Sequence, residues 1–197
     1  MRVVHAPSQL ERRPRAVALG TFDGVHRGHL AVVGALHDSG LEPTVITLDP
    51  HPRVALGNRV DLISTLERRL ELLEAAGVAE TLVAAFSPEF MRLGPSEFVA
   101  TYLEGIGARA VAAGESFRFG HRREGTLETL AEHGLDVLPV EQVPGVSSSA
   151  IREAVRSADL SGAAAMLGRP YELDGTVVAG DQRGGTLGYP TANIALG

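Results

Sequence analysis

The sequence contains no cysteine among its 197 residues. This excludes disulfides, thiolate nucleophiles, and zinc or iron–sulfur sites built on cysteine, so any metal must be held by oxygen or nitrogen ligands. The first fifteen residues also lack the apolar run of a secretory signal or a membrane span. We therefore expect a cytoplasmic protein with no membrane partner.

The sequence also has no excess of basic residues, because its formal net charge is -6. Such a balance disfavours broad binding to nucleic-acid phosphates, so we expect a small-molecule partner and no nucleic acid. The apolar fraction of 44% and the charged fraction of 21% are typical of a globular protein. The length fits one domain of ordinary size plus a short remainder, and no feature of the sequence indicates an oligomeric state.

Short apolar runs alternate with amphipathic stretches over most of the chain. They predict strands at 16–20, 44–48, 81–86, 109–113 and 136–139, and helices at 29–39, 65–76, 96–104 and 148–168. Apolar runs without strict alternation indicate a parallel sheet buried on both faces. The strand–helix order predicts an α/β fold with a doubly wound parallel sheet and right-handed crossovers. Ligands of such folds bind beyond the carboxyl ends of the strands.

The pattern changes near Gly168. Residues 171–197 contain strand-like pieces separated by glycines, with no helix between them. We therefore divide the chain into a domain at 1–168 and a short β-rich tail at 169–197. The tail is too short to bury a core of its own.

The segment from Gly20 to His29 lies where the first predicted strand passes into the first predicted helix. A helix N-terminus offers unpaired N–H groups and the positive end of the helix dipole, which together favour phosphate. Gly28 allows a phosphate to approach the backbone, and His26 and His29 can donate hydrogen bonds to its oxygens. The alternative is a tight turn at Gly24 with half-buried histidines. The strand–turn–helix context favours a nucleotide triphosphate site.

Two further loops follow predicted strands. Two prolines stiffen the loop that carries Asp49 and His51, so both side chains project from the carboxyl edge of the sheet. Plain turn chemistry is the alternative for this loop. In the loop after the fourth predicted strand, Phe117 and Arg118 either line a flat ligand or pack beneath the sheet edge.

Three consecutive serines, at 147–149, stand at the start of the last predicted helix. Capping of the helix accounts for one of them, but not for three. Ser148 and Ser149 lie on the first turn with Arg152, and hydroxyls and a guanidinium in this position form a second clamp for phosphate.

Taken together, these segments resemble the bacterial bifunctional riboflavin kinase/FAD synthetases. The chain departs from the family pattern at three positions: Leu48 stands where Phe is commoner, Ser116 replaces an Asp, and Ser149 replaces a Thr. The resemblance implies a Rossmann-like nucleotidyltransferase fold that transfers the adenylyl group of ATP to FMN, giving FAD and pyrophosphate. It also implies Mg²⁺ held by the phosphates of ATP, with no metal ligand from the first domain.

The resemblance assigns roles to individual residues. The catalytic residues would be His26, His29 and Arg152, and the ATP-binding residues Gly20, Phe22, Asp23, Gly24, Gly28, Ser148 and Ser149. Contacts to the flavin or its phosphate would come from Asp49, His51, Phe117 and Arg118, and Thr191 and Asn193 match nucleotide and metal ligands of the kinase half. Two alternatives stay open. One is a related nucleotidyltransferase with another phosphorylated acceptor, and the other is a nucleotide-binding module without turnover, which the loss of a carboxylate at Ser116 suggests.

We expect these 197 residues to make no FMN from riboflavin, because the sequence ends four residues after Asn193. A kinase barrel needs more strands to close, and the resemblance places the catalytic glutamate of that module further along the chain. The tail should be poorly ordered or loosely packed on the first domain, with exposed strand edges. Incubation with riboflavin, ATP and Mg²⁺ tests the expectation, and steady production of FMN would contradict it.

Overall fold

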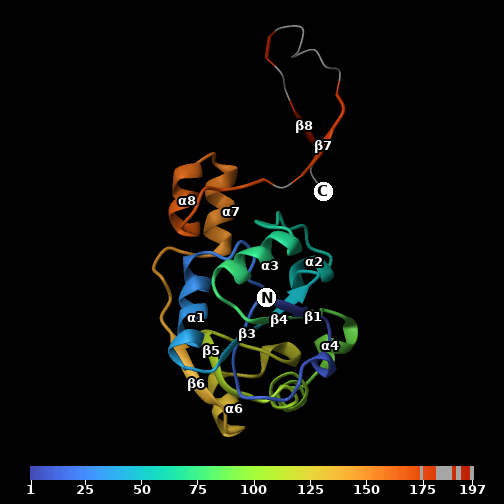
Figure 1. Ribbon diagram of the computed structural model, residues 1–197, viewed down its shortest axis with the longest axis vertical. Helices are drawn as coiled ribbons and strands as arrows, with labels where there is room; N and C mark the ends of the chain where they lie inside the picture. Colours follow the sequence, from blue (N-terminus) through green and yellow to red (C-terminus); the bar gives the residue numbers. More distant parts are fainter. Residues whose placement is uncertain (174, 181–187, 190–191, 196–197) are drawn as a thin grey trace.

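The computed structural model describes residues 1–173, 175–180, 188–189 and 192–195. Most of the chain forms one six-stranded parallel sheet in the order β1-β4-β3-β2-β5-β6. The strands are Arg2–Val4 (β1), Arg15–Leu19 (β2), Glu42–Asp49 (β3), Glu80–Ala85 (β4), Ala108–Gly114 (β5) and Asp136–Val140 (β6). Figure 1 shows helices packed around this sheet. The predicted α/β fold with a doubly wound parallel sheet is confirmed.

The helices lie between successive strands along the chain. They are Arg27–Asp38 (α1), Pro52–Ala55 (α2), Leu66–Ala75 (α3), Pro88–Arg92 (α4), Pro95–Phe98 (α5), Leu127–Glu132 (α6), Ser148–Arg156 (α7) and Leu160–Leu167 (α8). A π-helix at Val99–Glu104 continues α5, and short 3₁₀ helices lie at Pro7–Gln9 and His121–Arg123.

Strand β2 shows how the sheet divides two cores, because all five of its residues are buried. Val17 and Leu19 pack in the core that contains Phe98, whereas Ala18 packs in the core that contains Leu36 of α1. Successive side chains of a strand point to opposite faces, so a strand that is apolar at every position must be covered on both. The continuous apolar runs of the sequence therefore arise, as inferred, from a parallel sheet that is buried on both faces.

The order of the strands reverses at β2. The chain continues from β2 to β3 and β4 on one side, and later to β5 and β6 on the other side. The loops after β2 and β5 lead away in opposite directions at this point of the carboxyl edge, and open α/β sheets generally bind ligands at such a position. The segment from Gly20 to His26 is the first of these two loops.

Some elements differ from the prediction. Strand β1 was not predicted, since only one of its three residues is buried and the signal is short. The predicted helix 148–168 is two helices: Ala158 has a φ of 61°, which ends α7, and Asp159 caps α8 by accepting from Gly162 N at 2.8 Å. The short helices α2, α4 and α6 were also missed, because segments of four to six residues carry little periodicity.

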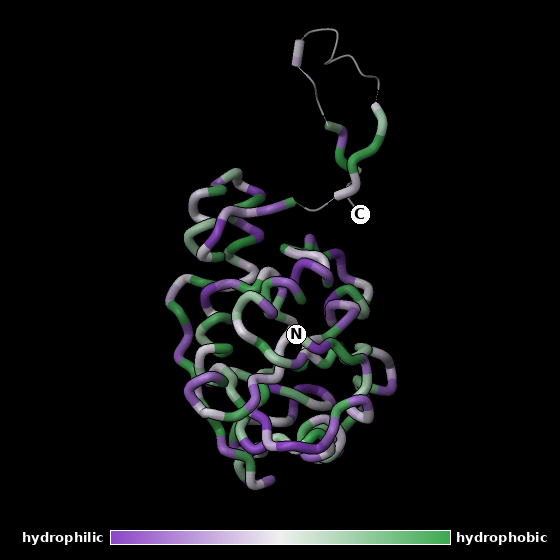
Figure 2. Tube along the Cα trace, in the orientation of Figure 1, coloured by the Kyte–Doolittle hydropathy of each residue, from purple (hydrophilic) through white to green (hydrophobic). Residues whose placement is uncertain are grey.

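The tail contains a two-stranded antiparallel sheet, formed by Thr176–Val178 (β7) and Asn193–Ala195 (β8). This confirms its predicted β-rich character. All six residues are exposed, and Figure 1 places the pair beyond α7 and α8, away from the parallel sheet. The two strands nevertheless carry the exposed hydrophobic residues Val177, Val178 and Ile194, and both are partly green in Figure 2. The domain boundary at Gly168 stays a prediction.

A buried ion pair joins the amino ends of β2 and β4 across β3. Arg15 is 0% exposed and Glu80 is 1% exposed, and Arg15 Nε donates to Glu80 Oε2 at 2.7 Å. Burial alone would raise the pKa of Glu80, but the hydrogen bond and charge of Arg15, with the nearby Arg13, hold it below its usual value. The pair therefore contributes to stability as long as Glu80 is ionised.

We predict that Glu80→Ala lowers the free energy of unfolding by about 3–5 kcal/mol, because it leaves the Arg15 guanidinium buried and unpaired. As a control, Glu42→Ala removes one of the two partners of Arg13, at a more exposed position, and should cost less than about 1 kcal/mol. The native pKa of Glu80 is depressed, so its contribution is complete above the ordinary value of 4.5 and is lost as the pH falls further. Urea unfolding at neutral and acid pH measures both effects. Equal losses from the two variants would contradict the prediction.

Candidate nucleotide-binding site

The loop between β2 and α1 has an unusual backbone. Phe22 and Val25 have φ values of 51° and 37°, and Gly24 has a φ of 80°. A left-handed conformation costs a non-glycine residue about 1–3 kcal/mol and persists only where the surroundings enforce it. Both side chains are 1% exposed. A Cβ on Gly24 would lie 2.6 Å from Ile63, and one on Gly20 would lie 3.2 Å from the Phe22 ring. Packing therefore fixes the path of the loop.

Hydrogen bonds hold the same loop from two sides. Asp23 is 0% exposed, and its Oδ1 accepts from the backbone N–H groups of Ile63 and Ser64 at 2.9 and 3.2 Å. From the other side, Arg169 Nη2 donates to Gly24 O at 2.8 Å and Nη1 to Val25 O at 3.2 Å. The carboxylate of Asp23, a predicted ATP-binding residue, is thus occupied by protein donors, and its role in ATP binding stays a prediction.

His26 and His29 cap the N-terminus of α1 reciprocally. His29 N donates to His26 Nδ1 at 3.3 Å, and His26 N donates to His29 Nδ1 at 3.4 Å. Their rings stack with centroids 3.6 Å apart and planes inclined by 16°. In each ring Nδ1 accepts a hydrogen bond, so the proton of a neutral imidazole lies on Nε2. The capping geometry therefore presents two Nε2–H donors side by side.

Both rings are held in the neutral form. The pKa of His26 is lowered to about 4, mainly by burial and to a smaller extent by the charge of Arg169, while Asp23 opposes the shift. Burial also lowers the pKa of His29 well below its usual value, with smaller effects from His26 and Arg69. At neutral pH the pair donates hydrogen bonds without carrying charge.

Packing against His26 also favours glycine at position 28, in addition to the predicted approach of a phosphate. A Cβ at this position would lie 3.1 Å from Cε1 and 3.2 Å from Nδ1 of His26, tighter than an ordinary contact. Any larger residue at 28 would push the His26 ring away from the stacked position. The glycine between the histidines therefore lets the His26 ring turn back over the first turn of α1.

The N-terminus of α7 docks onto this loop from more than a hundred residues away. Ser147 is the cap, as expected for one of the three serines, and its Oγ accepts from Ala150 N at 3.1 Å. Ser148 Oγ donates to Asp23 O at 3.2 Å. Arg152 donates from Nη2 to Asp23 Oδ2 and from Nε to Asp61 O at 2.8 Å. The structure therefore brings the predicted clamp of Ser148 and Arg152 to the histidine loop.

A small pocket of about 130 Å³ lies beside this junction. It is lined by Arg53, Arg59, Val60, Ser149, Arg152 and Arg156. Four guanidinium groups surround this cavity. Arg152 is paired with Asp23 and Arg156 with Asp61, so the excess positive charge comes from Arg53 and Arg59. Arg53 and Arg59 were not predicted as site residues. Arg53 directly follows the proline-rich loop, and a search for basic residues next to that loop would have found it.

His51 lies among the same charges. It is 8% exposed, caps α2, and accepts at Nδ1 from Arg53 N at 3.2 Å. Burial lowers the pKa of His51, and the nearby Arg152 and Arg69 lower it further while Asp23 raises it. His51 is therefore a third neutral imidazole at this edge. Asp49 is half-buried and ends β3, at the carboxyl edge of the sheet where it was predicted to lie.

Phe117 and Arg118 lie on the loop after β5, at the same edge of the sheet. The Phe117 ring stacks on Phe119 with centroids 5.9 Å apart, and Arg118 is exposed and donates to Phe117 O at 2.8 Å. Within the described part of the chain, no hydrogen bond or ring contact joins them to the histidine pair. Ser116, which replaces the family Asp, accepts from Gln142 Nε2 at 3.1 Å. The flavin-binding role of this loop stays a prediction.

The two residues assigned to the kinase module lie in or near the tail hairpin. Asn193 begins β8 and pairs with Val178, and its side chain lies against Gly180, where a Cβ would be 1.9 Å from Nδ2. Thr191 lies outside the described residues. Nothing in the described tail places Asn193 next to the site on the parallel sheet.

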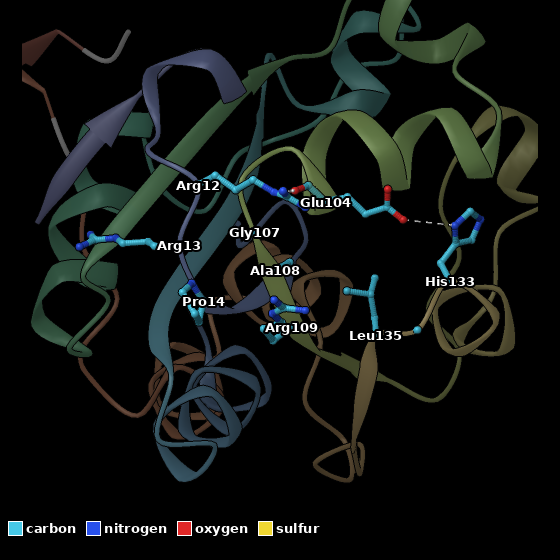
Figure 3. Close-up of a pocket in the computed structure, with 10 residues that line it drawn as sticks. Arg12, Arg13, Pro14, Glu104, Gly107, Ala108, Arg109, His133 and Leu135 are labelled. Carbon is cyan, nitrogen blue, oxygen red and sulfur yellow. Dashed lines mark hydrogen bonds and ion pairs between the residues drawn. The ribbon is translucent and has the colours of Figure 1, made fainter.

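A larger pocket, of about 390 Å³, lies at the opposite edge of the sheet (Figure 3). Its lining includes Arg12, Arg13, Arg109, Glu104 and His133. Arg13 is paired with Glu42 and Glu80, and His133 Nδ1 lies 3.6 Å from Glu104 Oε1. Because parallel sheets bind ligands at their carboxyl edge, we place the site at the smaller, arginine-rich pocket.

The doubly wound sheet, with the capped histidine pair at its reversal point, has an α/β nucleotidyltransferase-like fold. A family model described as FAD synthetase matches residues 8–156, and one described as riboflavin kinase matches residues 167–197. The chain belongs to the FAD synthetase family.

Similar proteins agree with this assignment. Relatives named bifunctional riboflavin kinase/FMN adenylyltransferase are 38% identical in Listeria monocytogenes, 36% in Bacillus subtilis and 32% in Escherichia coli. The matches cover 92%, 94% and 100% of this chain, and 62%, 63% and 67% of those proteins. The chain therefore spans a little under two thirds of the length of the first two relatives.

Solved structures give the same fold. One from Streptococcus pneumoniae, named macrolide-efflux protein, has a TM-score of 0.87 at 30% identity and matches 98% of this chain and 68% of its own. A pantothenate synthetase from Thermus thermophilus has a TM-score of 0.51 at 20% identity, matches 81% of this chain and 71% of its own, and shows a likeness of fold alone. Among the described residues, no helix combines the length and apolar character needed to cross a membrane.

We predict that His26 stays neutral in the native protein until the pH falls to about 4. Its native pKa lies below the ordinary value of 6.5, so the unfolded chain takes up the proton first. The contribution of His26 to stability is therefore complete above pH 6.5 and decreases as the pH falls towards 4. NMR titration of its ring resonances, in native buffer and in urea, measures the difference. A native midpoint near the urea value would contradict the proposed burial and capping.

Proposed function

We propose that this chain transfers the adenylyl group of ATP to FMN and releases pyrophosphate. The family supports this reaction, and one structural observation carries it: two neutral imidazoles present adjacent Nε2–H groups at the N-terminus of α1. Such donors, together with the helix dipole, suit a phosphate on which negative charge increases during reaction.

The reaction would be a direct in-line displacement. A phosphate oxygen of FMN attacks the α phosphorus of ATP, and a new P–O bond forms. The bond from that phosphorus to the bridging oxygen breaks, and its electron pair leaves with pyrophosphate. Both substrates are anions, so the protein has to align them and offset their charge, and no nucleophilic side chain is needed.

His26 and His29 would donate to the oxygens of the reacting phosphate. Since both pKa values are low, the two rings would bind the phosphate as neutral N–H donors and not as cations. Gly20, Phe22, Gly24 and Gly28 would shape the loop that receives ATP. In this scheme the histidines contribute fixed dipoles in a partly dry site, where they act more strongly than in water.

Arg152, Ser148 and Ser149 would hold the departing pyrophosphate. Arg152 is 8% exposed, and Asp23 and the Asp61 carbonyl fix two of its three nitrogens. Ser149 and the other arginines of the small pocket line the adjoining space. The guanidinium is therefore oriented before the ligand arrives, which reduces the entropy lost on binding.

The acceptor would lie towards the neighbouring loops. We assign Asp49, His51, Phe117 and Arg118 to the flavin or its phosphate, in keeping with their position at the same sheet edge. Mg²⁺ is assigned to the phosphates of ATP, because the carboxylate of Asp23 already accepts hydrogen bonds at both oxygens. When bound, the ion would offset phosphate charge. We place the reaction in the cytoplasm.

Incubation of the chain with ATP, FMN and Mg²⁺ tests the proposal directly. FAD and pyrophosphate should appear in equal amounts, as measured by chromatography. Parallel reactions with pantetheine phosphate and nicotinamide mononucleotide test the related transferases, which share the fold. Transfer to one of these acceptors but not to FMN would reject the acceptor proposed here, and absence of any transfer would leave a binding module.

We predict that His29→Ala lowers kcat for FAD formation by a factor on the order of 100 or more, since one preorganised donor to a transition state contributes ~2.7–4 kcal/mol. His26→Ala should behave similarly. His37→Ala is the control, because His37 lies on the last turn of the same helix and is exposed. Thermal unfolding of each variant checks that the fold persists. Similar rates in all three variants would remove the histidine pair from the reaction.

A further inference from the structure

Buried charges in the described part of the chain form pairs, with one exception. The buried charged side chains are Arg15, Asp23, Arg69, Glu80 and Arg152. Arg15 pairs with Glu80, and Arg152 pairs with Asp23. None of the ion pairs among the described residues includes Arg69. An unpaired buried charge is unfavourable, so its presence needs an explanation.

The guanidinium of Arg69 is only partly satisfied by the protein. Arg69 lies on α3 and is 1% exposed. Its Nη1 donates to Leu48 O at 3.1 Å and to Thr47 Oγ1 at 3.3 Å, whereas its buried Nε has no hydrogen-bond partner. Native proteins rarely leave such a donor unpaired, and those that do occur often mark functional positions. Burial lowers the pKa of Arg69, and the charges of Asp23, Asp49 and Glu67 only partly oppose this shift. No described carboxylate forms an ion pair with Arg69, and its Nε donor is unmatched.

The position of Arg69 connects it to both histidine-bearing loops. Thr47, which accepts from Arg69, donates to Thr21 O at 3.0 Å in the loop after β2. Leu48 immediately precedes the loop that carries His51. The positive charge of Arg69 acts on His29 and on His51, since it contributes to the lowered pKa of each. The unpaired cation therefore lies behind the carboxyl ends of β2 and β3, between the predicted ATP and flavin loops.

We propose that a phosphate group of the bound ligand supplies the counter-charge of Arg69, which makes Arg69 a positioning residue for that phosphate. This inference rests on the proposed function, because both substrates of that reaction carry phosphate. At 1% exposure the guanidinium acts mainly through its field and through the backbone that it holds. A charge of this kind strengthens the binding of phosphate at the sheet edge and does not stabilise the unliganded fold.

The neighbouring Arg68 provides a matched control. It lies on the same helix, but its partly exposed side chain is paired with Glu71 and Glu172. Arg68→Gln and Arg69→Gln remove the same charge from adjacent positions. A glutamine at 69 retains a donor for Leu48 O, and Arg69→Lys retains the charge without the planar guanidinium.

Calorimetric titration with ATP, FMN and riboflavin, each alone and without turnover, tests the proposal. Arg69→Gln should weaken ATP, FMN or both on the order of tenfold or more, as expected for loss of a charged partner, and leave riboflavin unchanged. Arg69→Lys should retain most of the affinity, and Arg68→Gln should match the wild type. Loss for ATP alone assigns the phosphate to the nucleotide, and loss for FMN alone assigns it to the flavin.

Urea unfolding of the unliganded variants provides the second measurement. Arg69→Gln should be at least as stable as Arg68→Gln, because the fold does not depend on the unpaired charge. Unchanged affinities, equal weakening of riboflavin and FMN, or a failure of Arg69→Gln to fold would each overturn the proposal. Binding is measured without catalysis, so an absence of FAD synthesis in the wild type would reject the proposed function without deciding the role of Arg69.

Discussion

The contact between Asp23 and Arg152 is the interaction on which the site depends. It is buried at both ends, and it joins the loop after β2 to the N-terminus of α7. Asp23 accepts from Ile63 N and Ser64 N on its other oxygen, so one carboxylate gathers three segments of the chain. In a low-dielectric interior, removal of either partner would leave an uncompensated charge. The pair therefore holds the loop after β2, residues 63–64 and the N-terminus of α7 together as one rigid unit.

This unit explains how an unfavourable backbone is maintained. Phe22 and Val25 adopt left-handed conformations that neither residue favours, and their side chains are buried among packed neighbours. The strain is offset by the anchored carboxylate next to Phe22 and by the reciprocal caps that begin immediately after Val25. As a result, the two imidazoles are already fixed in one arrangement before a ligand binds, so binding requires little reorganisation of the loop.

The sequence was sufficient to predict most of the sheet, and to predict the site residues that belong to a recognisable local motif. Apolar runs identified five of the six strands, and the segment from Gly20 to His29 located the histidine pair. The anchoring role of Asp23 and the unpaired charge of Arg69 could not be inferred from the sequence in the same way, because each depends on partners 21 to 129 residues away. Local patterns report periodicity and turns, but long-range pairing is decided by the packed fold. The prediction missed short elements such as β1 for a local reason, since a strand of three residues carries almost no periodic pattern.

The two hydrogen bonds from Arg169 have a consequence for how the chain is organised. Residue 169 falls within the riboflavin kinase match, whereas the carbonyls that it contacts, at Gly24 and Val25, fall within the FAD synthetase match. The backbone of the strained loop, which belongs to one module, is thus held in part by a side chain of the other. Any force or binding event that displaces residue 169 changes the free energy of that loop, and by reciprocity a ligand that orders the loop holds residue 169 in place.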